Sequence, residues 1–228
     1  GELPAYNFKR WLDFQAAGPD NIVSNKDQFG EETYLLTNEV IDKLNSWYRG
    51  KAYLYDNSAV IESEELESLL VTIEKAVCRY GIRFVCIDNL MTALDVDMRD
   101  DLYRAQSKFL RELKLLAYRH NIVVLLVAQP KKMKDGNFAN DDVAGSGDIT
   151  NRVDVVMSYS RSEDEACDSK LAITKNRLTG RLAMGENQIK LFYSNKSKRI
   201  TSVRSNGKNY SWQSEKEMIE SGLLDLPF

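Results

Sequence analysis

The amino-acid sequence predicts an α/β fold with a mostly parallel sheet flanked by helices and antiparallel strands toward its C-terminal end. Short runs of β-branched and aromatic residues alternate with longer segments of helical period. Two of these runs, residues 84–88 and 123–129, are apolar almost throughout, which is typical of central strands that are covered on both faces. After about residue 153 the strands follow one another through short polar connections such as residues 205–208, which predicts antiparallel pairing.

Each element is expected from its local pattern. The expected strands are residues 52–55, 84–88, 123–129, 153–159, 171–174, 188–192 and 200–203. The expected helices are residues 4–15, with Pro4 in the first turn, residues 38–48, residues 62–80, ended by Gly81, and residues 100–120. We expect residues 1–214 to form one core and residues 215–228 to form an acidic tail.

The composition excludes several classes of protein. A chain of 228 residues can bury a core without a disulfide or a structural metal. Its three cysteines form no CxxC pair and it has one histidine, so we expect neither a zinc cluster nor a disulfide framework, and a reducing cytoplasm is expected. The longest purely apolar run, residues 122–128, is too short for a membrane span, and we expect neither a span nor a secretory signal.

The net charge of −3 comes from the acidic tail. Residues 215–228 carry four acidic side chains and one lysine, so the other 214 residues hold 30 charges of each sign. An overall basic field is therefore excluded, and a contact with nucleic acid would need a local basic cluster. Lys131, Lys132 and Lys134 form such a cluster in the long polar stretch 131–148, where a solvated charge run and a phosphate contact are both open.

Polar side chains end the two apolar strands. Asp88 closes residues 84–88, and Gln129 closes residues 123–129. In open α/β sheets ligands bind at the carboxyl edge, where a carboxylate can hold Mg²⁺ or its water and an amide can sense a phosphate. Asp88 could equally cap the following turn, and this segment alone leaves both interpretations open. Two polar strand ends side by side favour a ligand site.

Two glycine-rich phosphate motifs are excluded. The sequence has Gly-Lys only at residues 50–51 and 207–208, where the other residues of GxxxxGK[ST] are missing. Residues 145–150 resemble GxGxxG only until the last position and follow a loop rather than a strand, so a dinucleotide fingerprint is rejected. Residues 175–180, KNRLTG, directly follow an expected strand and by themselves indicate a basic hairpin turn.

Taken in order, these segments resemble the RecA-type motor domain of the hexameric replicative helicases, the family of bacterial DnaB, the phage primase-helicases and mitochondrial Twinkle. The resemblance covers nearly the whole chain and rests on the order and spacing of the segments. The family consists of P-loop NTPases, so the resemblance implies a RecA-like sheet and a motor that binds and hydrolyses ATP.

The resemblance implies a role for each candidate residue. Glu2 would activate the attacking water, Asp88 would hold Mg²⁺ through water, and Gln129 would sense the γ-phosphate and couple it to DNA. Lys175 and Arg177 would reach the nucleotide on the adjacent subunit. The DNA-binding loop would include Lys131, Lys132, Lys134, Gly145, Ser146 and Gly147.

The same resemblance implies the activity and the partners. The complete protein would be an ATP-dependent DNA helicase that uses ATP or another NTP with Mg²⁺ and couples hydrolysis at subunit interfaces to movement along single-stranded DNA and to duplex unwinding. Its expected partners are single-stranded DNA, further copies in a hexameric ring, primase and polymerase, but no membrane. The expected location is the cytoplasm, as a bacterial protein or a phage protein in a bacterial host.

The chain departs from the family at two points. The first matched segment stands at residue 1, so we expect the P-loop to lie upstream, and the chain to be a fragment that is inactive by itself. Ala144 occupies a position where the family often has a charged residue, which leaves open whether this loop binds DNA as it does in the family. Two alternatives remain open: another RecA-like ATPase of the recombination or clock type, and a non-catalytic RecA-like adaptor.

Overall fold

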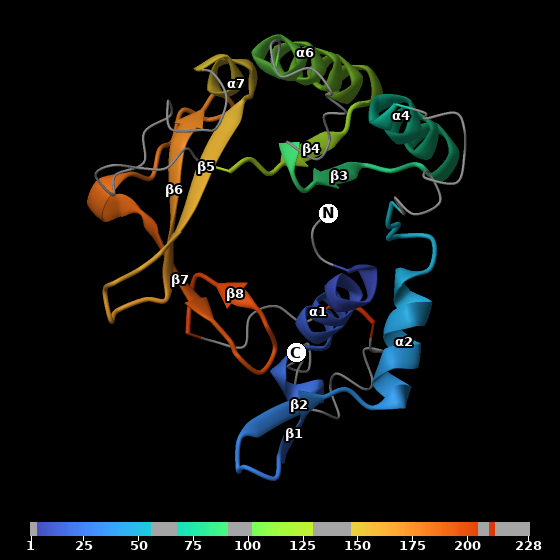
Figure 1. The fold of residues 1–228 in the computed structure, drawn as a ribbon, viewed down its shortest axis with the longest axis vertical. Coiled ribbons are helices and arrows are strands. Elements are labelled where there is room, and N and C mark those ends of the chain that lie inside the picture. Colours follow the sequence, from blue (N-terminus) through green and yellow to red (C-terminus); the bar gives the residue numbers. More distant parts are fainter. Residues whose placement is uncertain (1–3, 56–67, 91–101, 130–146, 205–209, 213–228) are drawn as a thin grey trace, which may run out of the picture. The chain divides into compact units, whose positions relative to one another are not determined.

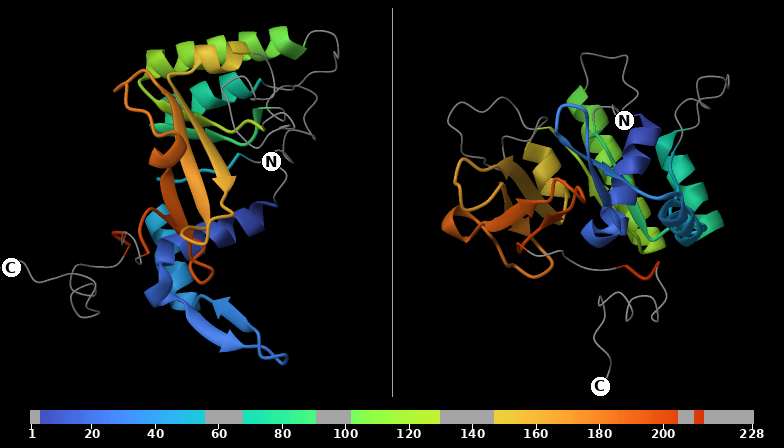
Figure 2. Two further views of the ribbon diagram at one scale, coloured as in Figure 1. Left: turned by 90° about the vertical axis from the view of Figure 1, so that its left-hand side faces the viewer. Right: turned by 90° about the horizontal axis from the view of Figure 1, so that it is seen from below.

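The structure of the chain, a computed structural model, describes residues 4–55, 68–90, 102–129, 147–204 and 210–212 (Figure 1). The chain divides into two compact units. The first comprises residues 56–159 and 171–188, and the second comprises residues 2–55, 160–170 and 189–228. Figure 2 gives two further views of the same elements.

The first unit is built on a pair of parallel strands. Strands β3 (Phe84–Ile87) and β4 (Val123–Leu126) pair in register, with Phe84 opposite Val123 and Ile87 opposite Leu126. Helices α4 (Leu69–Tyr80) and α6 (Leu102–His120) lie on the same side of this pair (Figure 1). The buried core between them contains Ile73, Val77, Ile87, Leu90, Phe109, Leu110, Leu113, Leu116, Ile122 and Ile149.

The opposite face of the β3–β4 pair carries apolar side chains that are exposed. Phe84 is 57% exposed, Val123 63% and Leu125 39%. Parallel strands are ordinarily covered on both faces, because their connections place helices on each side. This face is therefore the one on which a further layer of an α/β sheet would pack.

Helices α4 and α6 are joined by an ion-pair cluster at their surface. Helix α4 begins after the cap Ser68 and ends at Gly81, which has a φ of 67°. The Glu74 carboxylate of α4 lies 2.9 Å from Nε2 of His120 and accepts a hydrogen bond from Nη1 of Arg119 at 3.1 Å. The hydrogen bond with His120, and then that with Arg119, holds the pKa of Glu74 below its ordinary value. The chain's single histidine thus has a structural role between two helices.

A second sheet follows the short helix α7 (Gly147–Arg152). Its strands are β5 (Val155–Arg161), β6 (Ser169–Asn176), β7 (Ile189–Tyr193) and β8 (Ile200–Thr201), in the order β5-β6-β7-β8, with a 3₁₀ turn at Gly185–Asn187. Backbone hydrogen bonds from Ser162 to Asp168 and from Arg177 to Asp154 join the two ends of the β5–β6 pair, as in an antiparallel hairpin. Strands β7 and β8 are also antiparallel.

The second unit contains two helices and a hairpin. In chain order its elements are helix α1 (Ala5–Ala17), the 3₁₀ turn η1 (Pro19–Asn21), strands β1 (Val23–Lys26) and β2 (Glu32–Leu35), and helix α2 (Asn38–Tyr48). The two strands pair antiparallel and form the hairpin. The residues buried in this unit's core are Phe14, Ala16, Ala17, Ile22 and Leu44. The side chain of Thr37 caps α2 by accepting a hydrogen bond from Val40 N.

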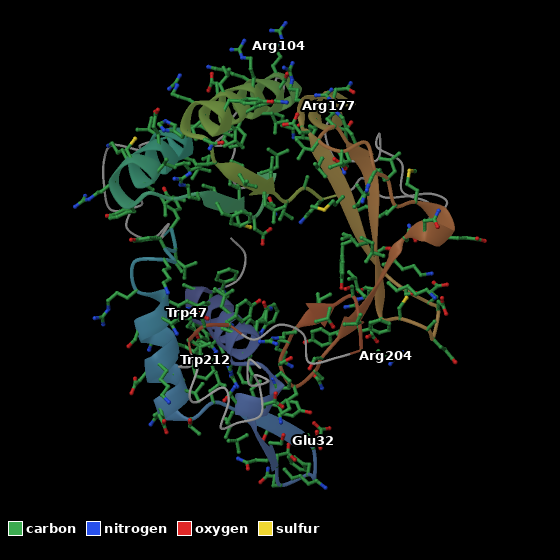
Figure 3. The ribbon with its side chains drawn as sticks, turned by 180° about the vertical axis from the view of Figure 1, so that it is seen from behind. Glu32, Trp47, Arg104, Arg177, Arg204 and Trp212 are labelled. Atoms are coloured by element: carbon green, nitrogen blue, oxygen red, sulfur yellow. The ribbon has the colours of Figure 1, made fainter. Side chains whose placement is uncertain are left out.

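The last turn of α1 is bound by residues distant in the sequence. The last four carbonyl oxygens of a helix have no partner within it. Here all four accept hydrogen bonds: Phe14 O from Gly18 N (3.1 Å), Gln15 O from Arg199 Nε (2.6 Å), Ala16 O from Trp212 Nε1 (3.0 Å) and Ala17 O from Asn21 Nδ2 (2.9 Å). Trp212 lies beside the same helix in Figure 3. These bonds tie the late residues 199 and 212 to α1.

The predicted fold class is confirmed: the chain is mixed α/β, with a parallel strand pair that packs against helices on one face and antiparallel strands toward its C-terminal end. Six of the seven expected strands correspond to β3, β4, β5, β6, β7 and β8. Within the described residues no helix has the length and apolar character needed to cross a membrane. The acidic tail 215–228 lies outside the described residues.

Two local predictions were wrong, and one element was not predicted. Residues 52–55 are not a strand, because the backbone N–H groups of Lys51 and Ala52 bind Tyr48 O and continue the end of α2 as a turn. The hairpin β1–β2 was missed because its strands are mostly polar and exposed. The helix expected from residue 62 begins at Leu69, since Ser68 is its N-cap.

Gly18→Ala should destabilise the second unit more than Gly50→Ala does. Both glycines have a φ of 73°, and at Gly18 a ψ of 164° adds to the strain, so an alanine at either position costs about 1–3 kcal/mol. A Cβ at Gly18 would also stand 2.9 Å from Nη2 of Arg199, whereas nothing lies within 4 Å at Gly50. Urea denaturation should therefore give Gly18→Ala a further loss of about 1–3 kcal/mol, because Arg199 must leave Gln15 O. Equal losses for the two variants would contradict the close approach of Arg199.

Candidate functional site

The parallel register brings two polar residues to one edge of the β3–β4 pair. Asp88 directly follows β3, and Gln129 lies three residues beyond the end of β4. The two strand ends stay joined, because Val127 N donates to Ile87 O and Leu90 N donates to Val127 O, both at 2.9 Å. Asp88 and Gln129 are both exposed at this carboxyl edge. The structure thus places Asp88 at the end of β3, whereas Gln129 was expected to close its strand and lies three residues beyond β4.

The Asp88 carboxylate is suited to a hydrated cation. It is exposed, and among the described residues no side chain forms an ion pair with it. Burial, and then the charge of Asp88, raises the pKa of the neighbouring Cys86 thiol. Mg²⁺ keeps several of its waters and is held through one or two carboxylates together with substrate phosphates. A single accessible carboxylate at a strand edge fits that need, and the described residues hold no cluster of three or more side chains typical of a closed metal site.

The two late basic residues lie together at the C-terminal end of helix α7. Lys175 is in β6, and Arg177 is the first residue after that strand. The ammonium of Lys175 donates to the carbonyl oxygen of Thr150 and, at 3.3 Å, to that of Asn151. Nη2 of Arg177 donates to the same Asn151 oxygen at 2.9 Å. Cations are favoured here because the last carbonyl groups of a helix carry partial negative charge. Figure 3 shows Arg177 at this end of the sheet.

Two residues that the sequence analysis did not single out complete this cluster. Nζ of Lys114, in α6, donates to Asp154 Oδ1 at 2.7 Å and to Arg152 O at 3.0 Å. The same Asp154 oxygen lies 4.0 Å from Nη1 of Arg177. We name the group formed by Lys114, Asp154, Lys175 and Arg177 the α7 cation cluster. Lys114 stands about 40 residues before Asp154 and 60 before Lys175, so no local sequence signal announces their contact.

The cations of the α7 cation cluster act on one another. Burial lowers the pKa of Lys175, and the positive charges of Arg177 and Lys114 lower it further. The carboxylate of Asp154 acts in the opposite direction and raises it. The cluster thus gathers three positive side chains against one negative side chain at a surface where water can enter.

Several predicted site residues lie outside the described residues. They are Glu2, Lys131, Lys132, Lys134, Gly145 and Ser146. Gly147, which was expected to end the DNA-binding loop, is the first residue of α7. Asp88 and Gln129 form one group and Lys175 and Arg177 another, and no hydrogen bond or ion pair within the described part of the chain joins the two groups.

No protein-family model matches the chain, and no curated protein matches it. Among solved structures, the chain is similar to a DnaB-like replicative helicase, whose structure was described together with its interactions with primase. The TM-score is 0.60 and the sequence identity 18%, over 87% of this chain and 48% of the helicase chain. The fold is DnaB-like. The chain spans about half the length of that helicase, and its described elements share the fold of that part.

Two substitutions should move the pKa of Lys175 in opposite directions. Lys114→Met removes a repelling positive charge and should raise the pKa of Lys175, whereas Asp154→Asn removes an attracting negative charge and should lower it. The measurement is an NMR titration of the Lys175 side-chain methylene next to the ammonium group. Lys170→Met, which removes a lysine paired with Asp164 instead, should leave that titration unchanged. Shifts of the same sign for both cluster variants would contradict the contacts described.

Proposed function

We propose that this chain is part of the motor domain of a replicative DNA helicase, which hydrolyses ATP or another NTP at subunit interfaces to move along single-stranded DNA and unwind a duplex. The observation that carries the proposal is the DnaB-like fold, in which Asp88 and Gln129 lie at the same carboxyl edge of a parallel strand pair. In sheets of this kind that edge is where ligands bind. A carboxylate and an amide at this edge suit phosphoryl transfer, because that reaction depends on positioning the reacting groups and on neutralising the charge of the phosphates.

The residues at the strand edge would position water and charge. Asp88 would hold the waters of a bound Mg²⁺, which when present neutralises charge that develops on the phosphates. Gln129 would hydrogen-bond the γ-phosphate or the attacking water from the next strand. Glu2 would orient that water and accept its proton. The exposure of Asp88 and Gln129 supports these roles, because both side chains are free to meet a ligand from solvent.

Lys175 and Arg177 would act on the nucleotide of a neighbouring subunit. Both lie on the α7 cation cluster, and the family resemblance implies that they reach the nucleotide of the adjacent subunit. A guanidinium that reaches the transferred phosphoryl stabilises charge in the transition state. We infer a ring of identical subunits, with six as the number that the family resemblance implies, in which each interface forms one such site.

The proposed partners follow from the same reasoning. Single-stranded DNA would contact Lys131, Lys132 and Lys134 and the residues 145–147 that lead into α7. Lysines can follow a phosphate backbone without reading its sequence. The solved helicase with the similar fold interacts with primase, and we propose primase as a further partner here. The phosphate-binding loop itself would be supplied by a segment outside these 228 residues, since the sequence has no GxxxxGK[ST] motif.

Asp88→Asn should abolish hydrolysis in the protein that carries the phosphate-binding loop. The amide retains the shape of the side chain but loses the charge that holds the hydrated Mg²⁺, so we expect DNA-stimulated ATP turnover to fall by about 10²-fold or more. Asp164→Asn removes the same charge from another exposed carboxylate and should leave turnover unchanged. Turnover by Asp88→Asn at the unaltered rate would remove Asp88 from the site.

The double substitution Lys131→Ala with Lys132→Ala should weaken binding of single-stranded DNA for all sequences alike. Each phosphate contact on a single strand contributes about 0.7 to the slope of log K against log salt, so the slope should become shallower by up to about 1.4. The measurement is DNA binding by fluorescence anisotropy at several salt concentrations. A matched double variant, Lys26→Ala with Lys108→Ala, removes two exposed lysines elsewhere and should retain the original slope. A retained slope in the first variant would exclude these lysines from the DNA contact.

A further inference from the structure

The α7 cation cluster has an excess of positive charge that its contacts do not neutralise. Lys114, Lys175 and Arg177 come from two distant segments and converge on the last turn of α7 and the residues after it. Three of their partners are backbone carbonyl oxygens, which accept hydrogen bonds but carry no full charge. Among the described residues, the only carboxylate that forms an ion pair with any of the three is that of Asp154.

The cluster is open to solvent at the side where these charges lie. The side chains of Lys114 and Asp154 are 29% and 36% exposed, and that of Arg177 is 51% exposed. The lowered pKa of Lys175 agrees with a crowded group of cations, because burial and the charges of Arg177 and Lys114 cause it. A polyanion that approached from solvent could therefore meet all three cations at once, and it would relieve their mutual repulsion.

We propose that Lys114 is a third cation of the phosphate-binding group formed by Lys175 and Arg177, and that Asp154 is an internal carboxylate that occupies this group until a triphosphate displaces it. This assignment rests on the proposed function, since that function makes the anion a nucleoside triphosphate. It adds two residues that neither the sequence pattern nor the family resemblance supplies.

The geometry explains why a phosphate would displace the Asp154 carboxylate from the cations of the cluster. One oxygen, Oδ1, lies 2.7 Å from Nζ of Lys114 and 4.0 Å from Nη1 of Arg177, so it binds the lysine closely and the arginine only weakly. A phosphate group offers three charged oxygens and can accept two parallel hydrogen bonds from a guanidinium. Arg177 can therefore gain from the exchange. Asp154 holds the cations together in the absence of nucleotide, and its carboxylate competes with the phosphate for the same donors.

The test is a titration of the 228-residue chain with inorganic triphosphate at low salt, with binding measured by isothermal titration calorimetry. Asp154→Asn should bind triphosphate about fivefold more tightly, because it removes a negative charge that lies 4.0 Å from Nη1 of Arg177 and competes with the phosphate for it. Lys114→Met should bind it about fivefold more weakly. Two controls carry the same charge changes at an ion pair elsewhere: Asp164→Asn and Lys170→Met should each bind within twofold of the unaltered chain. Near-ultraviolet circular dichroism of each variant should match that of the unaltered chain, which shows that folding is retained.

Three results would overturn the proposal: no measurable triphosphate binding by the unaltered chain, equal affinities for Asp154→Asn and Asp164→Asn, or equal affinities for Lys114→Met and Lys170→Met. The chain-level titration is independent of ATP turnover. If the four variants behave as expected while the protein with the phosphate-binding loop shows no DNA-stimulated hydrolysis, the helicase proposal fails and the anion site stands. If turnover is found but the titration gives one of the three contrary results, only the roles of Lys114 and Asp154 fail.

Discussion

The parallel register of β3 and β4 determines at which edge of the strand pair Asp88 and Gln129 lie. Each strand is four residues long, and the pairing of Phe84 with Val123 through Ile87 with Leu126 makes both strands end at the same edge. Their inward side chains pack on α4 and α6, so the edge cannot shift without disturbing the core of the first unit. Asp88 and Gln129 therefore stand on a rigid base while their own side chains remain exposed.

A different constraint positions the basic residues. Lys175 lies near the end of β6 and Arg177 directly after the strand, and their head groups bind carbonyl oxygens at the end of α7. Because α7 begins at Gly147, the helix connects the end of the expected DNA-binding loop to the carbonyl groups that hold these cations.

The sequence predicted those parts whose cause is local. Strands β3 and β4 were evident from apolar runs that end in a polar residue, and α2 and α4 from caps and helical period. The hairpin β1–β2 was not, because its strands are polar and its turn is made by Asp27, whose side chain accepts hydrogen bonds from Phe29 N and Glu31 N. Residues 52–55 have strand-like side chains but no partner strand among the residues that the structure describes. The contacts of Lys114 with Asp154 arise only when α6 meets the loop after α7, so no window of sequence contains them. The roles of Lys175 and Arg177 came from the family resemblance, and the residues alone indicated only a basic turn.

The central claim is that Asp88 and Arg177 serve one site from two subunits, and mixing of subunits tests it most directly. Asp88→Asn and Arg177→Ala versions of the protein that carries the phosphate-binding loop are each expected to be inactive. In rings assembled from equal amounts of the two, about one quarter of the interfaces should pair an intact Asp88 with an intact Arg177. The account predicts that DNA-stimulated ATP hydrolysis returns in the mixture to a corresponding fraction of the unaltered rate. Mixed rings that assemble and bind nucleotide, but show no return of hydrolysis, would contradict it.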